Sequence, residues 1–187
     1  MYRPNGGFLE MIVGCMYAGK SEELIRRMKR VHIAKQEAII FKPKIDNRYG
    51  EECICTHDGK KLRAIEVEKA SDILRFIDRN KHIQVVGIDE VQFFDKNIVV
   101  AINALTESGI RVMCSGLDLD FQGKPFGQVP RLLAHAEIVD KLQAVCVDCG
   151  QPATRTQRRI NGKPVYEGET VLVGGDESYV ATCSECY

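Results

Sequence analysis

A glycine-containing loop between a strand-like run and a helix-like segment constrains the fold most strongly. Residues 8–13 are mostly apolar, and residues 21–34 have the spacing of a helix. The sequence between them fits G-x-x-x-x-G-K-S and reads Gly14-Cys15-Met16-Tyr17-Ala18-Gly19-Lys20-Ser21. A strand that leads through such a loop into a helix is typical of α/β proteins that bind phosphate groups.

The residue types in this loop suit a nucleoside triphosphate. Glycines let the backbone wrap around an anion, so that N–H groups and the helix N-terminus point at the β-phosphate. Lys20 can then reach the β- and γ-phosphates, and Ser21 can ligate Mg²⁺. The alternative is a chance match in a glycine turn, which the flanking strand and helix disfavour.

The rest of the chain alternates between short apolar runs and helix-spaced stretches. Apolar runs recur at residues 38–41, 83–88, 110–114 and 136–139, and helical spacing recurs at 70–79 and 97–108. This alternation predicts an α/β fold with a mostly parallel sheet. The run at 83–88 is almost continuously apolar, so we expect a central strand that is covered on both faces. Residues 42–61 are polar and broken by proline and glycine, which predicts a long loop or a loose hairpin.

Bulk composition limits the classes of partner. The 187 residues suffice for one main domain and a small appendage. Lys plus Arg and Asp plus Glu number 26 each, so no net charge draws the chain to nucleic acid or to an anionic membrane. The sequence contains no signal-like N-terminus and no apolar run that approaches a membrane span, and we therefore expect a cytoplasmic protein.

Two adjacent carboxylates follow the expected central strand. Asp89 occupies the place where phosphate-loop enzymes keep the acidic residue that handles magnesium. Glu90 can accept a proton from an attacking hydroxyl, and we assign it as general base. Alternatively, both residues are solvated and begin a loop. The phosphate loop upstream favours the functional interpretation.

Four of the eight cysteines form two C-x-x-C pairs, which are Cys146 with Cys149 and Cys183 with Cys186. Four thiolates can surround one tetrahedral Zn²⁺, although the spacer is longer than in the usual ribbon pattern. With every ligand supplied by protein, such a zinc would be structural. A redox dithiol and unpaired core cysteines are the alternatives. We place a domain boundary here, with an ATP-binding α/β domain at 1–145 and a zinc-binding domain at 146–187.

Several segments together resemble the zinc-containing thymidine kinase family over residues 7–186. The phosphate loop with Met16 is similar to the family's G-x-M-x-x-G-K-S/T, and residues 88–94 are similar to its D-E-x-Q-F-F strand end. Residues 116–126 resemble its G-L-D-x-D-F-x-G-x-P-F segment, and residues 172–179 resemble the loop that folds over the bound base.

The resemblance implies an activity and a set of partners. It implies a RecA-like sheet with helices on both faces and a zinc-held lasso over the nucleoside. It also implies transfer of the γ-phosphate of ATP to the 5′-hydroxyl of thymidine, giving dTMP in nucleotide salvage for DNA synthesis. A homotetramer and inhibition by the end product dTTP belong to the same set of expectations.

The resemblance further implies site residues. Taken singly, the aromatic ones are more often core than ligand contacts. Asp58 and Arg158 also occupy family-like positions, with implied roles near magnesium and phosphate respectively. The base would be surrounded by Met16, Phe93, Leu117, Phe121 and Phe126, with Tyr179 closing the lid and backbone near Gly174 hydrogen-bonding its edge.

Two rival functions remain open on the sequence alone. A P-loop ATPase motor or switch shares the phosphate loop and the acidic strand end. A nucleic-acid-binding zinc module shares the cysteine pairs, and Arg155, Arg158 and Arg159 form a local basic cluster. Within the phosphate loop, Cys15 and Tyr17 occupy variable positions. An exposed Cys15 thiol would make the enzyme sensitive to oxidation.

Overall fold

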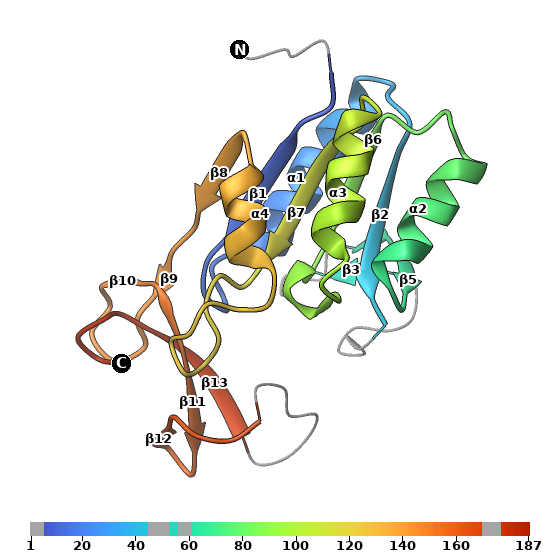
Figure 1. Ribbon diagram of the computed structural model, residues 1–187. Helices are drawn as coiled ribbons and strands as arrows, with labels where there is room; N and C mark the ends of the chain where they lie inside the picture. Colours follow the sequence, from blue (N-terminus) through green and yellow to red (C-terminus); the bar gives the residue numbers. More distant parts are fainter. Residues whose placement is uncertain (1–5, 45–52, 56–60, 170–176) are drawn as a thin grey trace.

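A six-stranded parallel sheet forms the centre of the computed structural model, which describes residues 6–44, 53–55, 61–169 and 177–187 (Figure 1). The strand order is β5-β2-β6-β7-β1-β8, and all neighbouring strands run parallel. The strands are β1 (Leu9–Val13), β2 (Ala38–Pro43), β5 (Ile65–Val67), β6 (Val85–Ile88), β7 (Arg111–Gly116) and β8 (Ile138–Lys141). Their carboxyl ends share one edge of the sheet.

Helices cover both faces of this sheet. Helix α1 (Lys20–Ile33) lies on one face, while α2 (Ala70–Arg79), α3 (Ile98–Glu107) and α4 (Val129–His135) lie on the other (Figure 1). A short 3-10 helix, η1 (Val91–Phe93), follows β6. The expected parallel α/β sheet with helices on both faces is therefore confirmed. None of the helices in the described part of the chain is long and apolar enough to cross a membrane.

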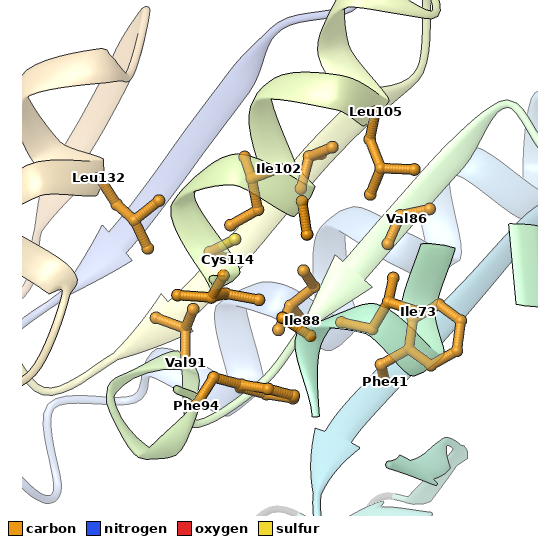
Figure 2. Close-up of a cluster of buried hydrophobic side chains, with 14 of the residues drawn as sticks. Phe41, Ile73, Val86, Ile88, Val91, Phe94, Ile102, Leu105, Cys114 and Leu132 are labelled. Atoms are coloured by element: carbon orange, nitrogen blue, oxygen red, sulfur yellow. The ribbon is translucent and has the colours of Figure 1, made fainter. Parts of the chain in front are cut away.

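The core has one apolar layer on each side of the sheet. Figure 2 shows the larger layer, in which Phe41 and Ile88 of the sheet meet Ile73 of α2 and Ile102 of α3. The smaller layer packs one stripe of α1 onto the opposite face, through residues at helical spacing: Leu24, Ile25, Met28 and Val31. All four residues of β6 are buried, which confirms the prediction of a central strand.

Most predicted elements are present, with boundaries shifted by at most two residues. Lys42 and Pro43 extend β2 rather than beginning the loop. Within the polar stretch, β3 (Cys53–Cys55) pairs antiparallel with β4 (Lys61–Arg63), in agreement with a loose hairpin. Strand β5 was not predicted, because three residues at a sheet edge are too few to show a period.

The C-terminal part of the chain consists of small antiparallel sheets. Strand β9 (Ala144–Val145) pairs with β10 (Pro152–Ala153), and β11 (Arg155–Ile160) lies between β12 (Lys163–Val165) and β13 (Glu177–Thr182). Asn161 and Gly162 have φ of 50° and 75° and form the two-residue turn between β11 and β12. The described residues beyond 145 contain no helix.

A charge network around the buried Glu10 joins β1 to the helix that follows the phosphate loop. Glu10 of β1 is 3% exposed and pairs with Arg27 of α1 at 2.8 Å and with Arg111 of β7 at 2.5 Å. Arg27 also reaches Asp140 of β8 at 2.5 Å. These contacts tie α1 to three strands. A cavity of about 1610 Å³ lies beside them at the amino ends of the strands and is lined by none of the predicted site residues.

Candidate active site and metal centre

The phosphate loop lies at the carboxyl end of β1 and has a preformed left-handed turn. Gly19 and Tyr17 have φ of 80° and 66°, and Gly14 has φ of 144°. A Cβ on Gly14 would lie 2.4 Å from the main-chain oxygen of Leu142, so this position requires glycine. The Lys20 ammonium spans the loop and donates to the Cys15 carbonyl at 2.8 Å. Burial lowers the pKa of Lys20, while the charges of Glu90 and Asp89 oppose that shift.

Asp89 meets the phosphate loop directly, as its position at a strand end predicted. The Ser21 hydroxyl lies 3.3 Å from Oδ2 of Asp89 and donates to it, and the buried Ser115 hydroxyl donates to Oδ1. Burial and the neighbouring charge of Glu90 raise the pKa of Asp89 to about 7. Hydroxyl and carboxylate oxygens are the ligand types that Mg²⁺ prefers. The structure thus brings the two predicted magnesium ligands together.

Glu90 leaves the strand in an unusual backbone conformation. Its φ of 49° and ψ of 44° lie in the left-handed region, which costs a residue with a side chain about 1–3 kcal/mol and is most often found at functional sites. The side-chain amide of Gln92 donates a hydrogen bond to Oε2 of Glu90. The carboxylate is close enough to Lys20 to oppose the lowering of its pKa. A carboxylate therefore lies near the lysine of the phosphate loop.

Two of the aromatic residues assigned to the nucleoside pocket pack against each other, and two others contact one arginine. The Phe93 and Phe126 rings lie edge to face with centroids 5.6 Å apart. The Phe121 and Tyr179 rings both face the Arg158 guanidinium, at 3.6 Å and 5.3 Å from its central carbon. Leu117, at the end of β7, donates its N–H to the Gln92 side chain at 3.1 Å. Gly174 and Asp58 lie outside the described residues.

Arg158 is an interior residue, although it belongs to the basic cluster of the sequence. It is 1% exposed and donates to the Tyr179 hydroxyl at 2.7 Å and to the Glu169 carbonyl at 2.6 Å. Its neighbour Arg159 pairs with Asp148 at 2.5 Å. The three arginines therefore do not form one continuous exposed basic surface, which removes the feature that favoured nucleic-acid binding.

Three consecutive residues of the phosphate loop bond to the C-terminal sheets. The Cys15 thiol donates to the Ala153 carbonyl at 3.3 Å, and the Met16 N–H donates to the Thr156 hydroxyl at 3.0 Å. The Tyr17 hydroxyl donates to the Tyr179 carbonyl at 3.0 Å. These hydrogen bonds fix the phosphate loop against the C-terminal sheets. Cys15 is 2% exposed and burial raises the pKa of its thiol, so the exposure that oxidation sensitivity required is absent.

The four paired cysteines converge on one point. Their sulfur atoms all lie within 4.8 Å of one another, and those of Cys149 and Cys183 are 3.6 Å apart. Thiolates at about 2.3 Å from one zinc ion would be separated by about 3.8 Å, so the cluster fits a tetrahedral metal. Burial opposes ionisation of Cys146, but N–H groups of Cys183, Asp148 and Cys149 lower the pKa of its thiol to about 6. This four-cysteine cluster has the ligand set and the sulfur spacing that a zinc ion requires.

Several contributors to the site were not predicted. Thr156 and Ala153 hold the phosphate loop through long-range contacts for which the sequence offers no signal. Ser115 did have a signal, because it is a hydroxyl residue that directly follows the apolar run Val112–Cys114. Gln92 stood inside a segment that resembled the family, but no role was assigned to it.

Comparison with solved structures finds a weak likeness to the ATPase DotB of Legionella pneumophila. The two chains are 15% identical with a TM-score of 0.43, and the match covers 71% of this chain and 35% of that ATPase. The chain therefore spans about a third of the length of that protein. A likeness of this size supports no conclusion about activity.

The family comparison is far more extensive. A model described as thymidine kinase matches residues 7–187, which include the phosphate loop, the Asp89-Glu90 pair and both cysteine pairs. These are the parts that the fold brings together at the carboxyl edge of the sheet and beside it. The chain therefore belongs to the thymidine kinase family, whose members are ATP-dependent phosphotransferases.

Proposed function

We propose that this protein transfers the γ-phosphate of ATP to the 5′-hydroxyl of thymidine, giving dTMP. The observation that carries the proposal is the contact between Ser21 of the phosphate loop and Asp89, at 3.3 Å. It joins a triphosphate-binding loop to a carboxylate pair within a chain of the thymidine kinase family. Phosphate donor, metal ligands and proton acceptor are then within one site.

The phosphate loop binds the donor in this proposal. Backbone N–H groups of residues 14–21 surround the β-phosphate, and Lys20 reaches the β- and γ-phosphates. Ser21 and Asp89 would hold Mg²⁺, which when bound offsets charge on the phosphate oxygens. The raised pKa of Asp89 fits a buried carboxylate whose charged form a cation would stabilise.

Glu90 is the general base of the proposed reaction. As the 5′-hydroxyl oxygen attacks the γ-phosphorus in line with the leaving ADP oxygen, Glu90 takes the hydroxyl proton. Its position next to Asp89 sets the base at the edge of the phosphate loop. The left-handed backbone at Glu90 directs the chain away from the strand at this point.

Apolar side chains with few polar contacts suit a nucleobase. We place the thymine ring between the Phe93–Phe126 pair and Phe121, which is 3% exposed. Fixed main-chain donors and acceptors would recognise the thymine edge, because an unmatched base would leave them unpaired. The complete proposed set is Met16, Phe93, Leu117, Phe121, Phe126, Gly174 and Tyr179, with Asp58 and Arg158 as supporting residues for magnesium and phosphate.

The metal of the four-cysteine cluster is proposed to be Zn²⁺ with a structural role. Four protein thiolates leave no coordination position for a catalytic water. Because the phosphate loop bonds to the same C-terminal sheets, the metal would hold the loop in place indirectly. The division into an ATP-binding domain at 1–145 and a zinc-binding domain at 146–187 belongs to this proposal.

Regulation and assembly follow from the resemblance alone. dTTP carries both the base of the acceptor and a triphosphate, so it can compete at the same site as an end-product inhibitor. A homotetramer in the cytoplasm, acting in nucleotide salvage for DNA synthesis, is the corresponding cellular form.

The direct test follows label from γ-labelled ATP in the presence of Mg²⁺ and each deoxynucleoside in turn. We expect label chiefly in dTMP. Deoxyuridine is the closest competitor, because it lacks only a methyl group that is worth roughly 10–200-fold in a tight pocket. ATP hydrolysis at one rate with or without nucleoside would contradict the proposal and favour an ATPase switch.

A further inference from the structure

The side chain of Gln92 lies between Glu90, the proposed general base, and the wall of the proposed nucleoside pocket. It belongs to η1, two residues after Glu90, and is 3% exposed. We propose that Gln92 is a positioning residue, which fixes the Glu90 carboxylate relative to the segment that begins at Leu117. This inference rests on the proposed function.

Both ends of the Gln92 amide are engaged, in opposite senses. Its Nε2 donates to Oε2 of Glu90, and its Oε1 accepts the Leu117 N–H at 3.1 Å. A reversed amide would place its NH₂ group against the N–H of Leu117 and its oxygen against the carboxylate. Only one orientation satisfies both neighbours, so the amide has a defined direction.

The backbone around Gln92 leaves room for this one arrangement. A Cβ at Gly116 would lie 2.5 Å from Oε1 of Gln92 and 2.9 Å from Cγ1 of Val91. A Cβ at Gly127, which has φ of 54°, would lie 2.6 Å from the main-chain oxygen of Gln92. Glycine at these two positions therefore leaves space for Gln92, for its side-chain amide at Gly116 and for its main chain at Gly127.

The link joins the reacting group to the pocket. Leu117 begins the segment that also supplies Phe121 and Phe126, so a shift of this segment would move the nucleoside. Glu90 has a long, flexible side chain, and proton transfer requires it within hydrogen-bond reach of the hydroxyl. Through its planar amide, Gln92 fixes the position of the Glu90 carboxylate relative to the nucleoside. A misplacement of about 1 Å at such a centre can cost roughly 100-fold in rate.

A buried glutamine that only satisfies the Leu117 N–H is the competing explanation. That role would make Gln92 important for stability, whatever residue stands at position 90. The positioning role makes its effect depend on the Glu90 carboxylate. The two roles therefore differ in a double-mutant cycle.

The experiment measures kcat and KM of purified full-length protein for Gln92→Met, Glu90→Gln and the double variant. We expect Gln92→Met to lower kcat by roughly 10–100-fold while both KM values change less than about threefold. In the Glu90→Gln background the same change should alter the residual rate by less than about twofold, because its target is gone. Equal losses in both backgrounds would overturn the proposal.

A second variant and a control distinguish a positioning effect from a general loss of activity. Gln92→Asn keeps a polar amide but is one methylene too short to span both partners, and we expect the same loss confined to kcat. Wild-type kcat in Gln92→Asn would also overturn the proposal. The control is Gln84→Met, an exposed glutamine whose Oε1 accepts the Glu37 N–H at 3.3 Å at the other end of the sheet, and it should behave as wild type. Absence of transfer in the wild type would instead refute the proposed function.

Discussion

Replacement of Arg158 by methionine should destabilise the protein and weaken thymidine binding. Arg158 is 1% exposed, and its guanidinium lies 3.6 Å from the centre of the Phe121 ring. It donates to the Tyr179 hydroxyl and to the Glu169 carbonyl. Methionine preserves much of the volume but removes all of these hydrogen bonds and the cation–π contact.

The size of the effect follows from the groups that lose a partner. Leaving a buried hydroxyl or carbonyl unpaired costs about 1–3 kcal/mol each. Loss of a desolvated cation–π contact costs about 2 kcal/mol. Relief of the guanidinium desolvation offsets part of this sum. We therefore expect a loss of about 3 kcal/mol in the free energy of unfolding, or about 6–12 °C in Tm for a chain of this size.

The assay combines thermal unfolding with the KM for thymidine and the KM for ATP. Thymidine KM should rise by roughly tenfold or more, because Phe121 and Tyr179 lose their common support, and the KM for ATP reports separately on the proposed phosphate role of Arg158. Arg159→Met is the matched control, since this neighbour pairs with Asp148 near the surface and should contribute less than about 1 kcal/mol. A Tm loss for Arg158→Met that is no larger than the control would refute the reasoning.

Four further perturbations have defined outcomes. Chelation of the metal proposed for the four-cysteine cluster should lower the stability and also the affinity for ATP, measured by dialysis with labelled ATP. Unchanged ATP affinity in the metal-free protein would contradict the proposed support of the phosphate loop. Tyr17→Phe removes the hydrogen bond from the phosphate loop to the Tyr179 carbonyl. We expect an ATP analogue to tighten thymidine binding, and the factor of tightening should be roughly threefold smaller in Tyr17→Phe than in the wild type; an equal factor in both proteins would be the adverse result. Gly116→Ala should displace the Gln92 amide and lower kcat more than it raises either KM, so a purely KM effect would count against it. Hydrogen bonds from two α1 arginines lower the pKa of Glu23 to about 2. Their stabilisation is present above the unfolded pKa of 4.5 and is lost as pH falls toward 2, so Glu23→Gln should show a flatter pH dependence of unfolding there, whereas an unaltered slope would speak against the assignment.

Local patterns predicted most of the fold. The phosphate loop, the helix after it and the central strand at 85–88 each depend on residues close in sequence, and all three are present. Strands β5, β9, β10 and β12 have only two or three residues each, which is shorter than the window in which a period can be recognised. The turn at Asn161-Gly162 is an exception, because an Asn-Gly pair is specific to a two-residue hairpin turn.

The candidate site divides in the same way. Ser21 and Asp89 were predictable, because the carboxyl ends of parallel strands meet at one edge. The interior position of Arg158 was not, since an arginine in a polar stretch is usually solvated, and its burial depends on the pairing of β11 with β13. The burial of Cys15 likewise depends on a carbonyl far along the chain. Contacts of this kind are set by packing and leave no periodic signal.

The most direct test of the central claim is a single-turnover experiment with γ-labelled ATP, comparing wild type with Glu90→Gln at saturating thymidine. If Glu90 is the general base at a preformed phosphate site, the variant should bind ATP with wild-type affinity but form dTMP at least roughly 100-fold more slowly. Formation of dTMP at the wild-type rate by Glu90→Gln would show that another group takes the proton and would contradict the account.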